Sequence, residues 1–515
     1  MIDDTHFDIL NVIESHGIYQ RNKNALICEK ETRTWGDFSG NINRVANFLK
    51  RRGFGKGDNI CLLVGNKIEI LELIFGIVKA GACVVPLSGL LTKEQIISLT
   101  NNSQSKCFIV DKDFIHLISR DKNDYQYVSK DNFFLLDHEE VNWGNIDKEI
   151  ANEKPEFLYK YDCDAHDNFN IIYSSGTTGL PKGIVQTHRA RSHWATSNAI
   201  EMSFNSFSRA LTTTALYSNG TWLMMLPTIF VGGTLFIMKN FDPEEFVNIV
   251  ERESISHTFL VPPQFGAILE IIDIKERNFS SIKAILSAGS PLRLDMKQKI
   301  LDLLTEKLYE LYGFSEGFAT MLKPEYQRTK FGTVGTPVLG FEIKILNEFE
   351  EECDVGQAGE IAGYGAGMMK EYFNEKKLTE QLIWKDKRGK SFIKSGDIGK
   401  LDEEGFLTIL DRKKDMIISG GLNVFPVDIE EILGKHPDIL DVTVIGIPDE
   451  KWGETCLALV IPKSEKNIDT EKVKDWANKK LAKHQRLSQV EIRKEFPRNA
   501  LGKVLKRFLR EPYWV

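Results

Sequence analysis

The sequence lacks the features that mark a secreted, membrane-spanning or zinc-binding protein. Its seven cysteines are spread over 515 residues without a close pair, so neither a disulfide framework nor a cysteine zinc site is indicated. The N-terminal MIDDTHFDIL has no basic stretch followed by an apolar one, as a secretory signal would. The longest apolar region, 223–238, is too short to span a membrane and is broken by Pro227 and two glycines. We therefore expect a cytoplasmic protein without a transmembrane segment.

An excess of positive charge is also missing. The chain has 66 Lys and Arg against 73 Asp and Glu, a net charge of −7, which disfavours tight binding to nucleic acid. Hydrophobic residues make up 42% and charged residues 27%, which is ordinary globular composition. This charge balance predicts no nucleic-acid partner. At roughly 150 residues per domain, the length predicts three to four domain equivalents.

Short apolar strands alternate with amphipathic helices through the first part of the chain. The segment 67–80 carries apolar residues at helical spacing and lies between two strand candidates, 59–64 and 83–87. Further strand candidates are 107–110, 170–173, 234–238, 257–261 and 284–286. This alternation predicts an α/β fold with largely parallel sheets.

The pattern changes twice in the last third of the chain. Glycine-rich 331–410 contains alternating strand candidates, which predicts a small antiparallel β-subdomain. After the charged run 411–415, helices and strands predict a compact α+β module. We place the domain boundary in this run, giving an N-terminal domain 1–412 and a C-terminal domain 413–515. The candidate elements are strands 342–346, 359–363, 405–409, 442–446 and 456–461, and helices 427–436 and 470–481.

One loop carries most of the chemical information. Between Tyr173 and Gly183, directly after a strand, stand three glycines, four Ser or Thr hydroxyls and one lysine. Successive N–H groups in such a loop form an anion-binding concavity. It is not a Walker A loop, because Lys182 follows Pro181 and not a glycine. A surface turn is the plainer alternative, but the whole string predicts a phosphate-binding loop, with candidate ligands Ser174, Ser175, Gly176, Thr177, Thr178, Gly179 and Lys182.

This loop resembles the phosphate-binding motif of the AMP-forming adenylating enzymes, the superfamily of acyl-CoA synthetases, adenylation domains and luciferases. Other segments resemble the remaining motifs of that family in the same order, so the resemblance covers essentially the whole chain. They are SAGSPL (287–292), ELYGFSE (310–316), KSGDIG (394–399), DRKKD (411–415), SGGLNVFP (419–426) and PRNALGK (497–503). The resemblance implies a large N-terminal domain and a small mobile C-terminal domain.

The resemblance also implies a reaction. A carboxylic acid joined to AMP has a good leaving group, and making that bond requires positive charge where two anions meet. Lys503 would supply this charge at the carboxylate and the α-phosphate, while Glu316 and Thr177 would hold Mg²⁺. Taken alone, Glu316 is better explained as a carboxylate in the first turn of a helix, and most of the basic residues around Lys503 as a solvated face.

The remaining nucleotide ligands also follow from the resemblance. Asp397 would bind the ribose hydroxyls, Arg412 the ribose or a phosphate, and Tyr312 would stack on adenine. Without the motifs, the first two form a loop salt bridge and Tyr312 is a core tyrosine. The same pocket would include Ser287, Ala288, Gly289, Glu310, Leu311, Gly313, Phe314 and Ser315.

Two reactions at one site imply a moving domain. In the family the C-terminal domain rotates after adenylation, which here assigns the hinge to Lys414 and the coenzyme A channel to Gly420 and Gly421.

The leading interpretation is therefore an AMP-forming carboxylic acid:CoA ligase of fatty acid metabolism that uses ATP, Mg²⁺ and coenzyme A. Loading of a carrier-protein thiol and noncatalytic nucleotide binding are the alternatives. The oligomeric state stays open, a homodimer included.

The acid itself is defined least by the sequence. We expect Tyr217, Ser218, Trp222, Gly289 and Phe314 to border it, although Trp222 and Phe314 are equally explained as core aromatics. Ser218 stands where relatives usually have histidine. No cationic residue is evident at this end of the pocket, which disfavours a dicarboxylate. A fatty or aryl acid is the expected substrate.

Overall fold

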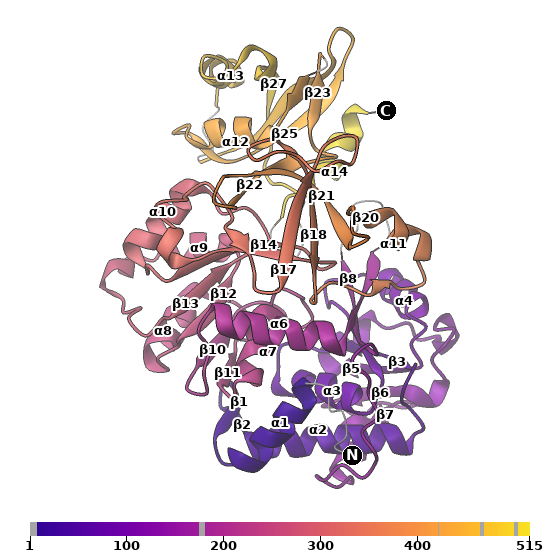
Figure 1. The fold of residues 1–515 in the computed structure, drawn as a ribbon. Coiled ribbons are helices and arrows are strands. Elements are labelled where there is room, and N and C mark those ends of the chain that lie inside the picture. Colours follow the sequence, from indigo (N-terminus) through magenta and orange to yellow (C-terminus); the bar gives the residue numbers. More distant parts are fainter. Residues whose placement is uncertain (1–7, 175–180, 421, 464–467, 499–502, 515) are drawn as a thin grey trace.

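The computed structural model describes residues 8–174, 181–420, 422–463, 468–498 and 503–514. This part of the chain forms a large body of two mainly parallel sheets with their helices, a small antiparallel sheet and a C-terminal module at one end of the molecule (Figure 1). No helix within it is long and apolar enough to cross a membrane. The predicted fold class is confirmed.

The first sheet is parallel at its centre and antiparallel at its edges. Its order is β16-β15-β14-β13-β12-β10-β11-β1-β2, and every pair from β14 to β1 is parallel. Fully buried strands of this kind need helices on both faces. The strands are β1 (Asn24–Cys28), β2 (Glu31–Thr34), β10 (Arg209–Thr212), β11 (Thr234–Ile237), β12 (His257–Leu260), β13 (Ala284–Ser287), β14 (Leu308–Gly313), β15 (Ala319–Leu322) and β16 (Thr336–Pro337).

The second sheet carries the predicted phosphate-binding loop. Its order is β19-β9-β8-β4-β3-β5-β6-β7, parallel from β8 to β7, with β9 and β19 antiparallel at one edge. The strands are β3 (Asn59–Leu63), β4 (Cys83–Pro86), β5 (Cys107–Asp111), β6 (Phe133–Leu136), β7 (Gly144–Asn145), β8 (Asn168–Ser174), β9 (Lys182–Thr187) and β19 (Glu371–Tyr372).

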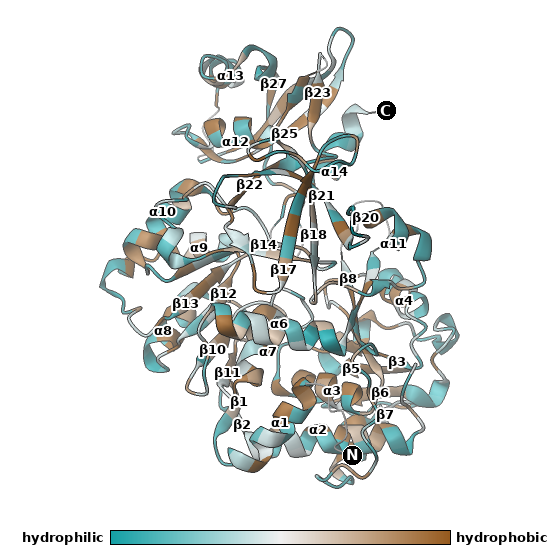
Figure 2. Ribbon diagram, in the orientation of Figure 1, coloured by the Kyte–Doolittle hydropathy of each residue, from teal (hydrophilic) through white to brown (hydrophobic). Residues whose placement is uncertain are grey.

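Two helices of the body begin at capping boxes. Thr34 and Asp37 form a capping box at the start of α2, and Thr92 and Gln95 form one at α4. The helices are α1 (Ile9–Tyr19), α2 (Trp35–Arg51), α3 (Ile68–Lys79), α4 (Lys93–Asn102), α5 (Ile146–Ala151), α6 (His188–Glu201), α7 (Trp222–Phe230), α8 (Pro243–Arg252), α9 (Pro262–Leu269), α10 (Leu294–Leu303) and α11 (Lys376–Leu382). Figure 2 shows the apolar strands β12 and β13 inside the body and hydrophilic residues along α11.

A row of edge-to-face aromatic rings crosses the core between the two sheets. Phe38 of α2 meets Phe75 of α3 at 6.1 Å between ring centroids, and Phe75 meets Phe169 of β8 at 6.3 Å. Phe169 in turn meets Trp222 of α7 at 6.2 Å. All four side chains are buried, and such pairs add about 0.5–1.5 kcal/mol each beyond the burial of area. The start of α7 is thereby fixed to the core.

The two smaller units follow along the chain. The antiparallel subdomain has the order β17-β18-β21-β20 with β22 on β21; its strands are β17 (Phe341–Leu346), β18 (Gly359–Gly365), β20 (Ile383–Lys385), β21 (Ser391–Leu401) and β22 (Leu407–Arg412). The C-terminal module has the order β24-β23-β26-β25 with β27 on β26; its elements are β23 (Ile417–Ser419), β24 (Leu422–Val424), α12 (Pro426–Gly434), β25 (Ile439–Asp449), β26 (Gly453–Pro462), α13 (Thr470–Asn478), β27 (Leu487–Ile492) and α14 (Lys506–Arg510). The boundary at 412/413 stays a prediction; β22 ends at Arg412.

Candidate active site

The predicted phosphate-binding loop joins β8 to β9. Ser174 ends β8, Lys182 begins β9, and the two residues are partners in the antiparallel register. The strands therefore bring both flanks of the loop side by side. The predicted ligands between them lie outside the described residues, as does Gly421; they are Ser175, Gly176, Thr177, Thr178 and Gly179.

Glu316 lies next to this hairpin. The hydroxyl of Tyr372 on β19 donates a hydrogen bond of 2.7 Å to Oε1 of Glu316. The ammonium nitrogen of Lys182 is 5.0 Å from the centroid of the Tyr372 ring. Burial and the charge of Glu316 raise the pKa of Tyr372, so its hydroxyl remains a donor. Lys182 and the Glu316 carboxylate thus meet at one tyrosine, although 134 positions of sequence separate them.

A second cluster forms where the body meets the antiparallel subdomain. The hydroxyl of Tyr312 on β14 donates a hydrogen bond of 2.8 Å to Oδ2 of Asp397 on β21. Arg412 of β22, the register partner of Asp397, places its Nε 3.3 Å from Oδ1. Asp397 is buried, so this is not the solvent-exposed salt bridge of little energetic value. Burial and the charge of Asp397 raise the pKa of Tyr312 well above its usual range.

Lys503 lies beside this second cluster. The pKa of its ammonium is lowered to about 8, chiefly by burial and also by the positive charge of Arg412, while the negative charge of Asp397 opposes the shift. Asp415 and Lys414, which follow β22, also act on the charge of Lys503, so the lysine lies near the start of the C-terminal module. The predicted catalytic lysine and the predicted ribose ligands are therefore together in this structure.

The segment that carries Lys503 is tied to the predicted hinge. Arg510 of α14 donates 2.6 Å and 3.2 Å hydrogen bonds to the carbonyl oxygens of Lys414 and Asp415. Lys506, one helical turn earlier, forms a 2.8 Å ion pair with Glu430 of α12. Sequence analysis did not single out either residue. Their four-residue spacing, which places them on one side of a helix, was the available signal.

Several predicted site residues point elsewhere. The Glu310 carboxylate accepts a buried 3.0 Å bond from Lys297, and Leu311 packs into the core. Trp222 is 1% exposed and donates its Nε1–H to the Leu216 carbonyl. Phe314 packs edge-to-face on Phe318 at 5.1 Å. For Glu310, Leu311 and Trp222, the structure gives the side chain a place in the core.

The other predicted residues lie at strand ends beside the clusters. Ser287 ends β13 next to Glu310 of β14, and Ala288 and Gly289 follow it, Gly289 with a φ of +93° that favours glycine. Gly313 ends β14 and is exposed. The carboxyl edge of the first sheet therefore presents backbone close to Tyr312.

Ser315 links the Glu316 turn to the predicted acid-binding segment. Its carbonyl oxygen accepts a 3.0 Å bond from Gln186, and its hydroxyl accepts a 3.3 Å bond from Asn219. Asn219 lies between Ser218 and Gly220, and Tyr217 and Ser218 are both partly buried. Asn219 also accepts a 2.8 Å bond from Arg191 of α6, a buried cation that sequence analysis missed.

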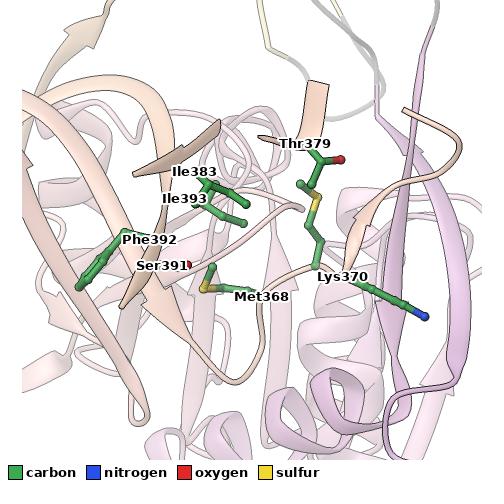
Figure 3. A pocket seen from close by; sticks show the side chains of 8 residues that line it. Met368, Lys370, Thr379, Ile383, Ser391, Phe392 and Ile393 are labelled. Carbon is green, nitrogen blue, oxygen red and sulfur yellow. The ribbon is translucent and has the colours of Figure 1, made fainter. Parts of the chain in front are cut away.

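One separate cavity is lined by none of the predicted site residues. It has a volume of about 80 Å³ and lies between β20, β21, α11 and the segment before β19. Figure 3 shows its mainly apolar walls, with the Lys370 side chain pointing away from the rest. It is smaller than the roughly 300 Å³ at which small-molecule sites begin, so it does not fit a nucleotide.

Comparison with known proteins identifies the family. The model of the AMP-binding enzyme family matches residues 14–373, and that of its C-terminal domain matches residues 428–503. The chain belongs to the AMP-binding enzyme family. This confirms the superfamily that the motifs resemble.

Named relatives within the family are similar along their whole length. A 2-succinylbenzoate–CoA ligase of Bacillus cereus is 28% identical over 97% of this chain and 98% of its own. A long-chain-fatty-acid–CoA ligase of Mycobacterium tuberculosis is 28% identical over 93% of each chain. The o-succinylbenzoate CoA synthetase of Bacillus subtilis, solved with its acyl-adenylate intermediate, is 26% identical over 97% of each chain, with a TM-score of 0.84. They agree with the predicted enzyme class, an AMP-forming ligase.

Proposed function

We propose that this protein is an AMP-forming carboxylic acid:CoA ligase that acts on a fatty or aryl acid. The observation that carries the proposal is the position of Lys503 beside the Tyr312–Asp397–Arg412 cluster. A basic residue beside the proposed nucleotide site suits a reaction in which two anions must meet. Relatives named for a long-chain fatty acid and for an aryl acid support the substrate class.

The first half-reaction joins the acid to AMP. A carboxylate oxygen attacks the α-phosphorus of ATP, and the bond to pyrophosphate breaks. In our proposal Asp397 binds the ribose hydroxyls and Arg412 binds the ribose or a phosphate, which fixes the nucleotide. Lys503 then spreads its charge over the carboxylate and the α-phosphate as the bond forms. The loop between Ser174 and Lys182 would bind the remaining phosphates.

The described residues fit a magnesium ion held mainly by the substrate. Mg²⁺ prefers hard oxygen ligands and usually takes only one or two carboxylates together with phosphate oxygens. The Glu316 carboxylate, fixed by Tyr372 next to Lys182, meets this requirement. Thr177 completes the proposed ligand set. When bound, the ion would offset negative charge on the phosphates.

The second half-reaction transfers the acyl group to coenzyme A. The thiol sulfur attacks the acyl carbon, and AMP leaves. We infer that the C-terminal module rotates about Lys414 between the half-reactions, so that Gly420 and Gly421 line the thiol channel. Gly420, which directly follows β23, has a φ of +59°, and its N–H donates a hydrogen bond to the Trp452 carbonyl. A domain boundary at 412/413 would place this hinge directly after β22.

We also infer a cytoplasmic location. The seven cysteines, all of which lie in the described part, form no disulfide. Free thiols in this number are typical of a reducing compartment.

A screen of short, medium, long-chain and aryl acids tests the proposal. The purified protein receives ATP, Mg²⁺ and each acid, and release of pyrophosphate and AMP is measured with and without coenzyme A. We expect acid-dependent pyrophosphate exchange, and acyl-CoA when coenzyme A is present. Exchange without acyl-CoA would favour a carrier-protein thiol as acceptor. No exchange with any acid would contradict the proposed function.

A further inference from the structure

Arg191 is a buried cation without a carboxylate partner in the described part of the chain. It is 2% exposed, and no ion pair involves it there. Burial lowers the pKa of its guanidinium to about 9. A buried charge is costly unless an opposite charge or several hydrogen bonds compensate it. A fold that places an arginine here therefore leaves a strong demand for oxygen acceptors around it.

Neutral amides meet only part of this demand. Arg191 Nε donates to Asn170 Oδ1 at 2.7 Å, and Nη1 donates to Asn219 Oδ1 at 2.8 Å. The guanidinium carbon lies 4.4 Å from the centroid of the Trp222 ring, which closes one face of the group. Nη2 is buried and has no hydrogen-bond partner among the described residues, and the same holds for Nδ2 of Asn170. Two donors that share one neighbourhood are thus left without an acceptor.

The same neighbourhood adjoins the proposed acid site. Asn219, which holds Arg191, is the immediate neighbour of Ser218, and its own Nδ2 donates to Ser315 beside Glu316. One bridging side chain therefore connects Arg191 to the segments proposed to hold the acid and the metal.

We propose that Arg191, with Asn170, binds a second carboxylate on the acid substrate, distinct from the carboxylate that is adenylated. A guanidinium presents paired N–H donors that match a carboxylate, and the two donors without a partner are of the right type. The substrate is then a fatty or aryl skeleton with two carboxylates. This inference rests on the proposed function and reverses the expectation that disfavoured a dicarboxylate. That expectation considered only residues near 217–222, whereas Arg191 lies on the preceding helix α6.

The chemistry makes Arg191 a specificity residue. A site built to hydrogen-bond a charged group rejects the analogue that lacks it, because the buried donors stay unpaired. Hydrogen bonds to charged groups are worth about 1.5–3 kcal/mol, which corresponds to about 10- to 100-fold in kcat/KM. If Arg191 only stabilised the fold, its substitution would change kcat/KM for both acids of a matched pair by the same factor.

The experiment uses pairs of acids with the same skeleton. Straight-chain monoacids are compared with their α,ω-diacids, and benzoate with benzoates that carry a carboxyalkyl group, by pyrophosphate exchange. We expect the unmodified enzyme to prefer the diacid of at least one pair by about 10- to 100-fold. Arg191→Met should abolish that preference and leave kcat/KM for the monoacid within a few-fold, and Arg191→Lys should keep part of it. Arg189→Met, an exposed arginine on the same helix, is the matched control and should change nothing.

The outcomes separate this inference from the proposed function. Exchange with monoacids but no preference for any diacid would overturn the role of Arg191 and leave the ligase intact. Equal loss for both members of a pair in Arg191→Met would overturn it too, since it would show a purely structural role. If that variant does not fold, as judged by thermal denaturation with ATP, the ratio of the two rates in Arg191→Lys decides instead. Absence of exchange with every acid would contradict the proposed function and the inference with it.

Discussion

The body and the C-terminal module contribute to the candidate site in different ways. The body, taken here together with the antiparallel subdomain, supplies Tyr312, Asp397 and Glu316 from strands and turns that pack on continuous cores, and each of the three makes a side-chain hydrogen bond there. The module supplies Lys503 from a segment outside its main sheet, held by Arg510 and Lys506 at the hinge and α12. In the proposed function, nucleotide binding would depend on fixed groups, and the charge that drives the first bond would depend on a group that moves with the module.

The comparison makes a simple general prediction. Changes to the body should affect both half-reactions, because both use the bound nucleotide. Changes to the module should affect one half-reaction and spare the other.

The largest effect is expected for Lys503→Ala. Loss of one charge that stabilises a transition state typically costs about 10²–10³ in rate. We expect that loss in acid-dependent pyrophosphate exchange, while thioester formation from a supplied acyl-adenylate continues. Lys494→Ala, an exposed lysine of the same basic stretch, is the control. Equal loss in both half-reactions would contradict the two-state scheme.

The next effect is expected for Asp397→Asn. The substitution removes the charge that Arg412 pairs with and weakens the proposed contact with the ribose hydroxyls. Hydrogen bonds to charged groups suggest a rise in KM for ATP of about 10- to 100-fold. The thioester step should be impaired as well, since AMP is bound there too. Glu403→Gln, on an exposed turn, should leave both steps unchanged. An effect confined to one half-reaction would contradict the expectation that changes to the body affect both half-reactions.

The pH dependence of the first half-reaction should reflect Lys503. Below a pKa of about 8 its amine is protonated and carries the charge that the reaction needs; above it the charge is lost. Exchange should therefore fall as the pH rises through about 8, by at most about tenfold per pH unit. Lys503→Arg keeps its proton at higher pH, so whatever activity remains should lose this decline. If the decline in exchange with rising pH persists in Lys503→Arg, a titrating group other than Lys503 causes it.

The smallest effect is expected for Gly420→Ala. A left-handed φ costs a residue with Cβ about 1–2 kcal/mol, and the new Cβ would lie 2.8 Å from the Trp452 ring. We expect a modest fall in the melting temperature of the module and slower acyl transfer to coenzyme A, with unchanged pyrophosphate exchange. Gly405 also has a positive φ, but a Cβ there would meet nothing. Gly405→Ala therefore measures the effect of backbone strain without a contact such as that with Trp452. Unchanged acyl transfer in Gly420→Ala would contradict the proposal that Gly420 lines the thiol channel.

Local sequence signals predicted much of the fold correctly. Short continuous apolar runs predicted the central strands β3, β4, β5, β12 and β13 to within a residue or two. Such runs are typical of parallel strands that are buried on both faces. The glycine-rich change of pattern after residue 331 predicted the antiparallel subdomain. Short or polar strands such as β2, β10 and β20 were missed, since their pairing partners, and not their own composition, make them strands.

The motifs determined the family and the residue types of the site, because a hydroxyl-rich glycine loop, a carboxylate and a lysine are required by the chemistry itself. Only the tertiary structure decided where those side chains point. It placed Glu310 on Lys297 and Trp222 in the core, and it brought Arg191 next to Asn219. These outcomes depend on contacts between residues far apart in the chain, which a local pattern does not specify. Burial exists only once the elements have packed. The charge state of Lys503 and the donor of Arg191 for which the described residues offer no acceptor therefore depend on the tertiary structure.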